Sequence, residues 1–193
     1  MASTRTITHS SSGASCKIHD FGATVLSYQT GAGRECIFLS RDAKLDGTKA
    51  VRGGIPLVFP QFGQPDKAMP QHGFLRNNYW QVDESSAYDN SDSAGITYSL
   101  EFKNVQAGKG GKWDEITELN CTCFYAIKIE ANKMTTTLEI RNTSAKPFNF
   151  QTLQHTYYKV DGNAALDASQ CFVKGLEGYS VMDKVTNEEY TVG

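Results

Sequence analysis

Three short segments of the chain concentrate side chains that can bind or protonate a ligand. The first, residues 51–63 (VRGGIPLVFPQFG), places one arginine, Arg52, among three glycines and two prolines. Glycines let a backbone approach a ligand closely, and prolines stiffen its path. The composition fits either a ligand-binding loop or a structural turn that crosses the end of a β-sandwich.

The second segment, residues 69–77 (MPQHGFLRN), holds Gln71, His72 and Arg76 in one short loop. Arginine is a natural partner of phosphate, because its planar guanidinium forms two parallel charge-assisted hydrogen bonds. A single arginine is more often a surface charge. If the two segments meet, Arg52 and Arg76 can bracket a dianion.

The third segment, residues 148–158 (FNFQTLQHTYY), is expected to be a strand with one polar face. Alternation puts Asn149, Gln151, His155 and Tyr157 on that face and aromatic residues on the other. A polar face in mid-strand suits a sugar-binding groove, where hydroxyl groups need partners and an aromatic edge packs a ring. His155 then lies in the groove, although a lone histidine also fits a structural role with its hydrogen bonds satisfied.

The elements that must position these segments are strands. Apolar residues alternate with polar ones, which predicts half-buried antiparallel strands, over residues 96–102, 119–129 and 134–140. Residues 131–133 predict a tight turn that joins the last two strands. Residues 18–28 and 35–39 are expected to form another hairpin.

The remaining polar stretches are predicted to be connections between strands. Residues 84–95 are rich in Ser, Asp and Asn, and residues 104–112 carry three glycines and two lysines. We find no long helical stripe, internal repeat or domain linker. Many short strands separated by turn residues predict an all-β sandwich that forms a single domain over residues 1–193.

Composition excludes several classes of function. The chain has 193 residues and a net charge of −2, without the basic stripe typical of nucleic-acid binders or an apolar run that would span a membrane. The five cysteines are expected to be reduced thiols in the cytoplasm. Cys121 and Cys123 form a C-x-C on one face of a strand, but no second pair stands at zinc-site spacing, so no metal site is expected.

Four stretches together resemble a known family. The stretches are RGGIPLVFPQFG, PQHGFLRN, NTSAKPFNFQTLQHTYY and GLEGYSVMDK, in that order. They resemble the glucose-6-phosphate 1-epimerases, or hexose-6-phosphate mutarotases, of the galactose mutarotase-like superfamily. The resemblance implies a β-supersandwich with a sugar site on its concave face. It also implies an enzyme that interconverts the α and β anomers of hexose 6-phosphates without a cofactor or metal. We expect the protein to be a monomer.

The resemblance further implies a role for individual residues. Arg52 and Arg76 bind the substrate, including its phosphate, and His155 is the catalytic acid. Gln71 and His72 bind sugar hydroxyl groups. Substrate binding also includes Asp183 of the last motif.

The sequence departs from the family pattern at its C-terminal end. The family's catalytic base is a glutamate in a later segment, and no glutamate of this chain stands in that motif, so the base is unknown. We expect the family domain to be incomplete here, lacking roughly its last third. Two interpretations follow: an incomplete copy of a longer enzyme, inactive as a mutarotase by itself, or a stable sugar-phosphate-binding module without catalysis. Sheet edges left unpaired in either case favour association.

Overall fold

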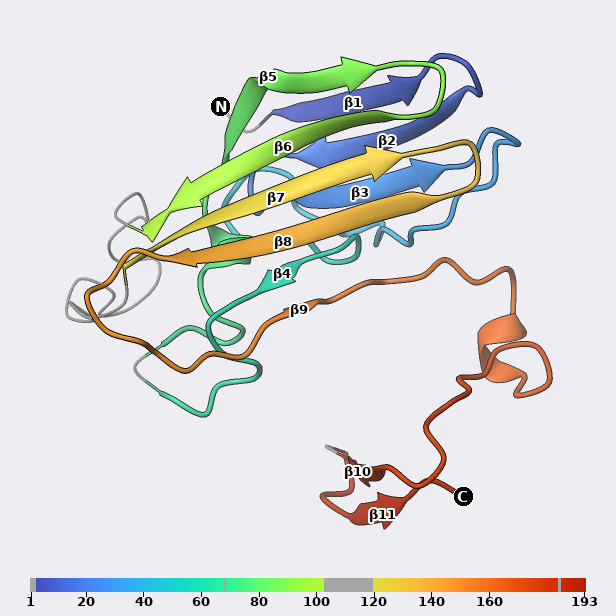
Figure 1. Cartoon of the computed structure of the whole chain (residues 1–193). Helices are drawn as coiled ribbons and strands as arrows, with labels where there is room; N and C mark the ends of the chain where they lie inside the picture. Colours follow the sequence, from blue (N-terminus) through green and yellow to red (C-terminus); the bar gives the residue numbers. More distant parts are fainter. Residues whose placement is uncertain (1–2, 68, 103–119, 184) are drawn as a thin grey trace. The chain divides into compact units, whose positions relative to one another are not determined.

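The computed structural model describes residues 3–67, 69–102, 120–183 and 185–193. Internal contacts divide the chain into two compact units, Met1–Lys159 and Val160–Gly193 (Figure 1). The predicted connection at residues 104–112 lies outside the described residues. The prediction of one domain over residues 1–193 stays a prediction.

The first unit contains a four-stranded antiparallel sheet with the order β5-β6-β7-β8. The strands are β5 (Gln81–Asp89), β6 (Ala94–Glu101), β7 (Cys121–Ile129) and β8 (Met134–Asn142). The three alternating runs of the sequence form β6, β7 and β8, so these predictions are confirmed over the described residues. Every second residue of β7 is buried, and the sulfur atoms of Cys121 and Cys123 lie 4.0 Å apart on one face. The predicted turn is confirmed by a hydrogen bond from the Glu130 N–H to the Lys133 carbonyl, 2.8 Å long.

The prediction that residues 84–95 form a loop is largely wrong. Strand β5 continues to Asp89, and the turn occupies residues 90–93 alone. The pairing with β6 shifts register between Asp83 and Tyr88, where the Ser86 hydroxyl oxygen accepts a hydrogen bond from the backbone of β6. Short polar side chains can replace ladder bonds in this way, so the Ser- and Asp-rich composition marks a bulged edge strand.

A second sheet has the order β1-β2-β3 and is also antiparallel. Its strands are β1 (Thr4–His9), β2 (Ala14–His19) and β3 (Thr24–Gln29). The hairpin predicted between residues 18–28 and 35–39 is only partly correct, because the second stretch meets β3 through an isolated bridge from Gln29 to Glu35. The Glu35 carboxylate accepts the backbone N–H of Tyr28 at 3.0 Å, so a side chain replaces a bond of the ladder.

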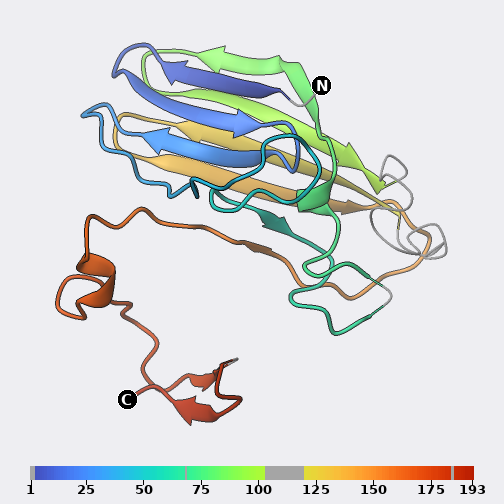
Figure 2. The ribbon, with the colours of Figure 1, turned by 180° about the vertical axis from the view of Figure 1, so that it is seen from behind.

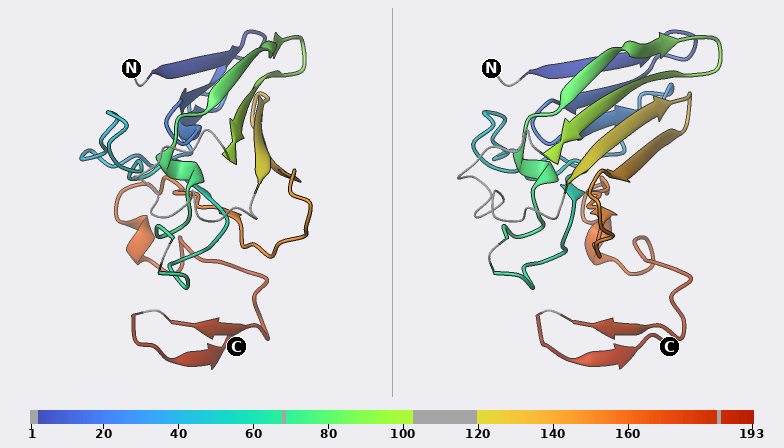
Figure 3. Two further views of the ribbon diagram at one scale, coloured as in Figure 1. Left: turned by 90° about the vertical axis from the view of Figure 1, so that its left-hand side faces the viewer. Right: turned by 60° about the vertical axis from the view of Figure 1, so that its left-hand side comes forward.

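The two sheets lie face to face, as the ribbons in Figures 2 and 3 show. The apolar side chains between them form one continuous buried core. Ile18 of β2, Tyr98 of β6 and Tyr125 of β7 are fully buried in it. Complete burial of an aliphatic side chain such as that of Ile18 contributes about 1.5–3 kcal/mol. The prediction of an all-β sandwich is confirmed.

Three short elements carry the segments that hold the candidate site residues: β4 (Leu57–Val58), η1 (Leu75–Asn77) and β9 (Leu153–Gln154). Strands β4 and β9 pair antiparallel. The strand predicted over residues 148–158 is therefore mostly wrong, since β9 is its only regular part. Phe148 and Phe150 instead pack their rings against Phe59, at centroid distances of 6.4 and 5.2 Å.

The second unit contains a short helical turn, η4 (Ala164–Leu166), and a hairpin of β10 (Ser180–Met182) and β11 (Glu189–Thr191). Its large apolar side chains are mostly exposed, including Leu166, Val173 and Val185. A lone two-stranded hairpin is marginally stable in water. Over the whole described part of the chain, no helix combines the length and apolar character needed to cross a membrane.

Candidate functional site

Backbone pairing next to β4 and β9 brings the first and third segments together. The Tyr157 N–H donates to the Gly54 carbonyl, and the His155 N–H donates to the Pro56 carbonyl, both at 2.9 Å. Proline has no N–H, but its carbonyl still accepts. Gly54 has a φ of +71°, and a Cβ there would come within 2.3 Å of a carbonyl oxygen of β3, so the close approach requires glycine.

The second segment is attached to the first and then anchored in the core. The Phe74 N–H donates to the Phe59 carbonyl at 3.0 Å. In η1, Leu75 is fully buried and its carbonyl accepts the indole N–H of Trp80 at 3.0 Å. This buried turn carries the half-buried side chain of Arg76.

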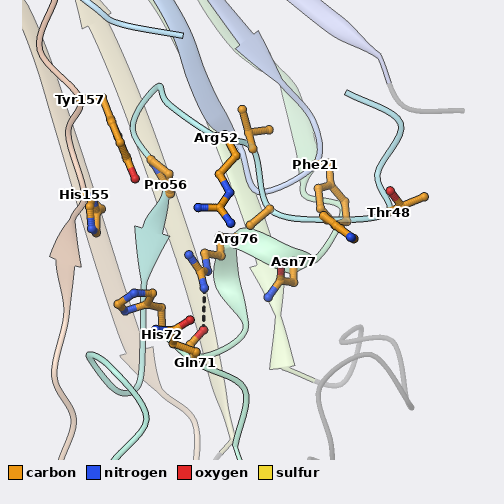
Figure 4. A pocket seen from close by; sticks show the side chains of 13 residues that line it. Phe21, Thr48, Arg52, Pro56, Gln71, His72, Arg76, Asn77, His155 and Tyr157 are labelled. Carbon is orange, nitrogen blue, oxygen red and sulfur yellow. Dashed lines mark hydrogen bonds between the residues drawn. The ribbon is translucent and has the colours of Figure 1, made fainter. Parts of the chain in front are cut away.

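These contacts border a pocket of about 470 Å³, a volume within the range of small-molecule sites (Figure 4). Five of the six predicted site residues line it, namely Arg52, Gln71, His72, Arg76 and His155. The other lining residues are Phe21, Thr48, Lys49, Ala50, Val51, Pro56, Asn77 and Tyr157. The three segments therefore share one hollow, while the individual roles of their residues stay predictions.

The hydrogen-bond donors of the Arg76 guanidinium are only partly satisfied inside the protein. Its Nη2 donates to the Gln71 carbonyl at 2.9 Å, whereas its buried Nε has no hydrogen-bond partner. Burial lowers the pKa of Arg76; Tyr157 partly opposes this effect and the neighbouring Arg52 adds to it. A guanidinium nevertheless stays protonated in proteins. Two adjacent cations, one with an unused buried donor, form a site that a bound anion would stabilise.

Three rings form one wall of the pocket. The centroids of His72 and His155 are 5.8 Å apart, and His155 stacks on Tyr157 at 5.1 Å with an angle of 21° between the rings. Burial lowers the pKa of His72 below its ordinary value of 6.5, and the nearby Arg76 and His155 lower it further. Imidazole and phenol groups both donate and accept hydrogen bonds, so this wall suits a ligand that carries hydroxyl groups.

The polar face predicted for the third segment is only partly present. His155 and Tyr157 line the pocket, but Asn149 and Gln151 do not. The side-chain oxygen of Gln151 instead accepts the backbone N–H of Phe62 at 3.0 Å. Strict alternation fails here because the segment leaves regular strand geometry on both sides of β9.

Sequence reasoning missed three polar residues of the pocket, Thr48, Lys49 and Asn77. Lys49 adds a third cation, and its only signal in the sequence is its place three residues before Arg52. Asn77 directly follows Arg76 within the second segment. None of the three positions stands out by spacing alone, because a surface threonine, lysine or asparagine is common in any connecting segment.

Asp183, the sixth predicted site residue, belongs to the second unit. Its carboxylate accepts the backbone N–H groups of Val185 and Thr186 at 2.7 and 3.3 Å. Its own N–H donates to the Glu188 carbonyl at 2.9 Å. These bonds close the turn between β10 and β11, as expected of a turn aspartate. Its role in substrate binding stays a prediction.

Known proteins with similar sequences cover most of this chain. The family model described as aldose 1-epimerase matches residues 4–193. A protein of Cenchrus ciliaris named "Putative glucose-6-phosphate 1-epimerase" is 30% identical over 174 residues, which cover 90% of this chain and 50% of that protein. A protein of Escherichia coli (strain K12) with the same name is 28% identical over 173 residues, which cover 89% and 52%. The chain thus spans about half the length of the curated relatives it matches.

A solved structure shows the same fold. YeaD of Salmonella typhimurium, described as a "putative mutarotase", matches with a TM-score of 0.77 at 20% sequence identity, covering 99% of this chain and 58% of that one. The galactose mutarotase-like sandwich predicted from the sequence is therefore confirmed. Because the family model matches nearly every residue, the chain belongs to the aldose 1-epimerase family.

Proposed function

We propose that this chain forms the sugar-phosphate pocket of a hexose-6-phosphate mutarotase, which interconverts the α and β anomers of glucose 6-phosphate and related sugar phosphates. The observation that carries the proposal is the unpartnered, buried Nε of Arg76 beside Arg52 in a pocket with two histidines. The names of the curated relatives support the same class of substrate.

The positive side of the pocket recognises the phosphate. Arg52 and Arg76 bracket it, and Lys49 adds a third positive charge to the lining. A guanidinium can form two parallel hydrogen bonds to one phosphate, which gives orientation as well as affinity. Gln71 and His72 bind sugar hydroxyl groups, and we assign the same role to Asp183.

The ring wall supplies the acid for the reaction. His155 donates a proton to the ring oxygen O5 while the C1–O5 bond breaks, and a base takes the proton of the C1 hydroxyl. The product is the open-chain aldehyde. After rotation about the C1–C2 bond, the O5 hydroxyl attacks the other face of C1, His155 regains its proton and the base returns the other. No electron is transferred, so the step needs no redox cofactor.

No residue of this chain is assigned as the base. Among the described residues that line the pocket there is neither an aspartate nor a glutamate. A positioned general base or acid typically contributes 10²–10⁴-fold, roughly, to the rate. We therefore propose that residues 1–193 alone bind the sugar phosphate without accelerating anomer exchange. This observation also favours the second candidate function, a non-catalytic sugar-phosphate-binding module.

We further propose that the protein is monomeric and cytoplasmic. The structure contains five free cysteines, of which Cys171 is exposed and Cys36 is half-buried. Accessible free thiols persist in a reducing compartment. Analytical ultracentrifugation of the purified chain tests the monomer, and a mass above that of one chain would contradict it.

Exchange spectroscopy by NMR tests the function. Cross-peaks between the anomeric protons of α- and β-glucose 6-phosphate report the exchange rate, and calorimetry reports binding. We expect the chain to bind glucose 6-phosphate more tightly than glucose and to leave the spontaneous exchange rate unchanged. Accelerated exchange that the His155→Ala variant abolishes would establish an active enzyme and contradict the binding-only proposal. Failure to bind either sugar would contradict both candidate functions.

A further inference from the structure

Two hydrogen bonds join Gly63 and His72 at the edge of the pocket. The His72 N–H donates to the Gly63 carbonyl at 2.7 Å, and the Gly63 N–H donates to Nδ1 of the His72 ring at 3.1 Å. The pair joins the end of the first segment to the second segment. The second bond fixes a proton position, because a backbone N–H is always a donor and Nδ1 must then be an unprotonated acceptor.

A neutral imidazole with an unprotonated Nδ1 carries its proton on Nε2. We propose that the backbone of Gly63 holds His72 as the neutral Nε2–H tautomer, so that His72 is a fixed hydrogen-bond donor to the sugar and exchanges no proton during the reaction. The inference rests on the proposed function. It divides the two histidines of the pocket between two roles, since His72 orients the sugar and His155 transfers the proton.

The surroundings of His72 oppose a second proton on its ring. Arg76 of η1 and His155 of the segment after β9 lie near it, and the Phe62 ring packs at a centroid distance of 5.1 Å. A charged imidazole here would repel Arg76 and would turn an Nδ1–H toward the Gly63 N–H, so the loop bond would break. Burial also lowers the pKa of His72, which favours the neutral ring.

The backbone around His72 is not that of an ordinary surface turn. His72 has a φ of +67°, a region that residues other than glycine rarely adopt and that is enriched at functional sites. Gly73 follows with a φ of +72°. A Cβ on Gly73 would lie 1.9 Å from the Phe59 carbonyl oxygen, so the chain can follow this path only with glycine there.

The first test measures the tautomer of His72, and its measurement on the free protein needs no ligand and is independent of the proposed function. Long-range ¹H–¹⁵N correlation spectra of histidine-labelled protein distinguish the Nδ1–H tautomer, the Nε2–H tautomer and the imidazolium, and the His72→Asn variant identifies the His72 signals. We expect His72 to be the Nε2–H tautomer at pH 7 and to remain so after glucose 6-phosphate is added. An Nδ1–H tautomer, an imidazolium or an average of two tautomers at pH 7 would overturn the proposal.

A matched pair of variants separates the two nitrogens. The amide oxygen of His72→Asn can accept a hydrogen bond at the position of Nδ1, and asparagine tolerates a positive φ. The longer side chain of His72→Gln places its amide N–H near the position of Nε2 and leaves no acceptor at the position of Nδ1. We expect His72→Asn to keep the Tm and to weaken glucose 6-phosphate binding by about 3- to 10-fold, the effect of one neutral hydrogen bond. His72→Gln should lower the Tm more than His72→Asn does.

The outcomes of the second test are distinct. Equal Tm losses in the two variants would contradict the acceptor role of Nδ1. Unchanged binding in His72→Asn would contradict the donor role of Nε2. If the wild-type chain binds no glucose 6-phosphate while the tautomer is as expected, the proposed function fails. The inference that the Gly63 backbone holds His72 as the Nε2–H tautomer then still stands.

Discussion

Arg76→Met is the change that separates phosphate recognition from general sugar binding. Methionine keeps an unbranched apolar stem but removes the guanidinium, including the Nε that has no partner within the protein. The free pocket loses one internal bond, from Nη2 to the Gln71 carbonyl. The complex loses every bond that the guanidinium makes to the phosphate.

The two losses differ in size. A hydrogen bond between charged groups contributes about 1.5–3 kcal/mol. Its loss raises the Kd for glucose 6-phosphate by about 10- to 150-fold, since 1.4 kcal/mol is roughly a factor of ten. The bond to the Gln71 carbonyl is exposed, so water can replace it, and removing a half-buried charge beside Arg52 offsets part of its loss. We therefore expect weak phosphate binding in a protein whose stability changes by less than about 1 kcal/mol.

Titration calorimetry with glucose 6-phosphate and with glucose measures the effect. The matched control is Arg141→Met, because Arg141 lies in β8 with 61% of its side chain exposed, pairs with Glu139 and stacks over the Phe124 ring at 4.4 Å. It removes the same charge outside the pocket, so binding should not change. If Arg76→Met raises the Kd for both sugars by the same factor, the phosphate role of Arg76 is refuted. If Arg141→Met weakens glucose 6-phosphate as strongly, the effect is one of net charge.

Gly73→Ala should destabilise the fold by more than about 3 kcal/mol, because the new Cβ would lie 1.9 Å from a backbone oxygen. Gly63→Ala should cost only about 1 kcal/mol, because Gly63 also has a positive φ, +67°, but has open space around it. Equal costs in urea denaturation would contradict this crowding argument. Ellman's reagent should modify the exposed Cys171 quickly, whereas burial raises the pKa of Cys16 so far that it should react only on unfolding. A fast phase whose amplitude is undiminished in Cys171→Ser would contradict that assignment. The lowered pKa of His72 means that the unfolded chain binds this proton more readily, so stability should be full above pH 6.5 and should fall on acidification. A Tm difference between wild type and His72→Asn that does not vary from pH 8 to pH 5 would contradict it.

The sandwich was predictable from the sequence because its central strands alternate without interruption. In β7 one face is buried from Cys121 to Ile129, and a shift of one residue would expose all of it. The edge strand β5 was not predictable by the same rule. Most of its residues are exposed, so its sequence does not have to alternate apolar with polar residues. Its Ser and Asp residues gave a loop signal that pairing with β6 overrides.

The meeting of the three segments at one pocket was harder to predict from sequence patterns. Motif resemblance named five residues that line the pocket, but their meeting depends on long-range backbone bonds, such as that from the His155 N–H to the Pro56 carbonyl. No local pattern encodes such a pairing, because it joins short irregular stretches far apart in the sequence. Lys49 was missed for the same reason, since its role as a lining residue follows from the path of the chain before Arg52.

A crystal structure of the chain with glucose 6-phosphate tests the central claim most directly. We predict the phosphate within hydrogen-bond distance of the guanidinium groups of Arg52 and Arg76, with the sugar ring oxygen facing the His155 ring. A sugar phosphate bound elsewhere, or bound in this pocket with its phosphate away from both arginines, would contradict the account.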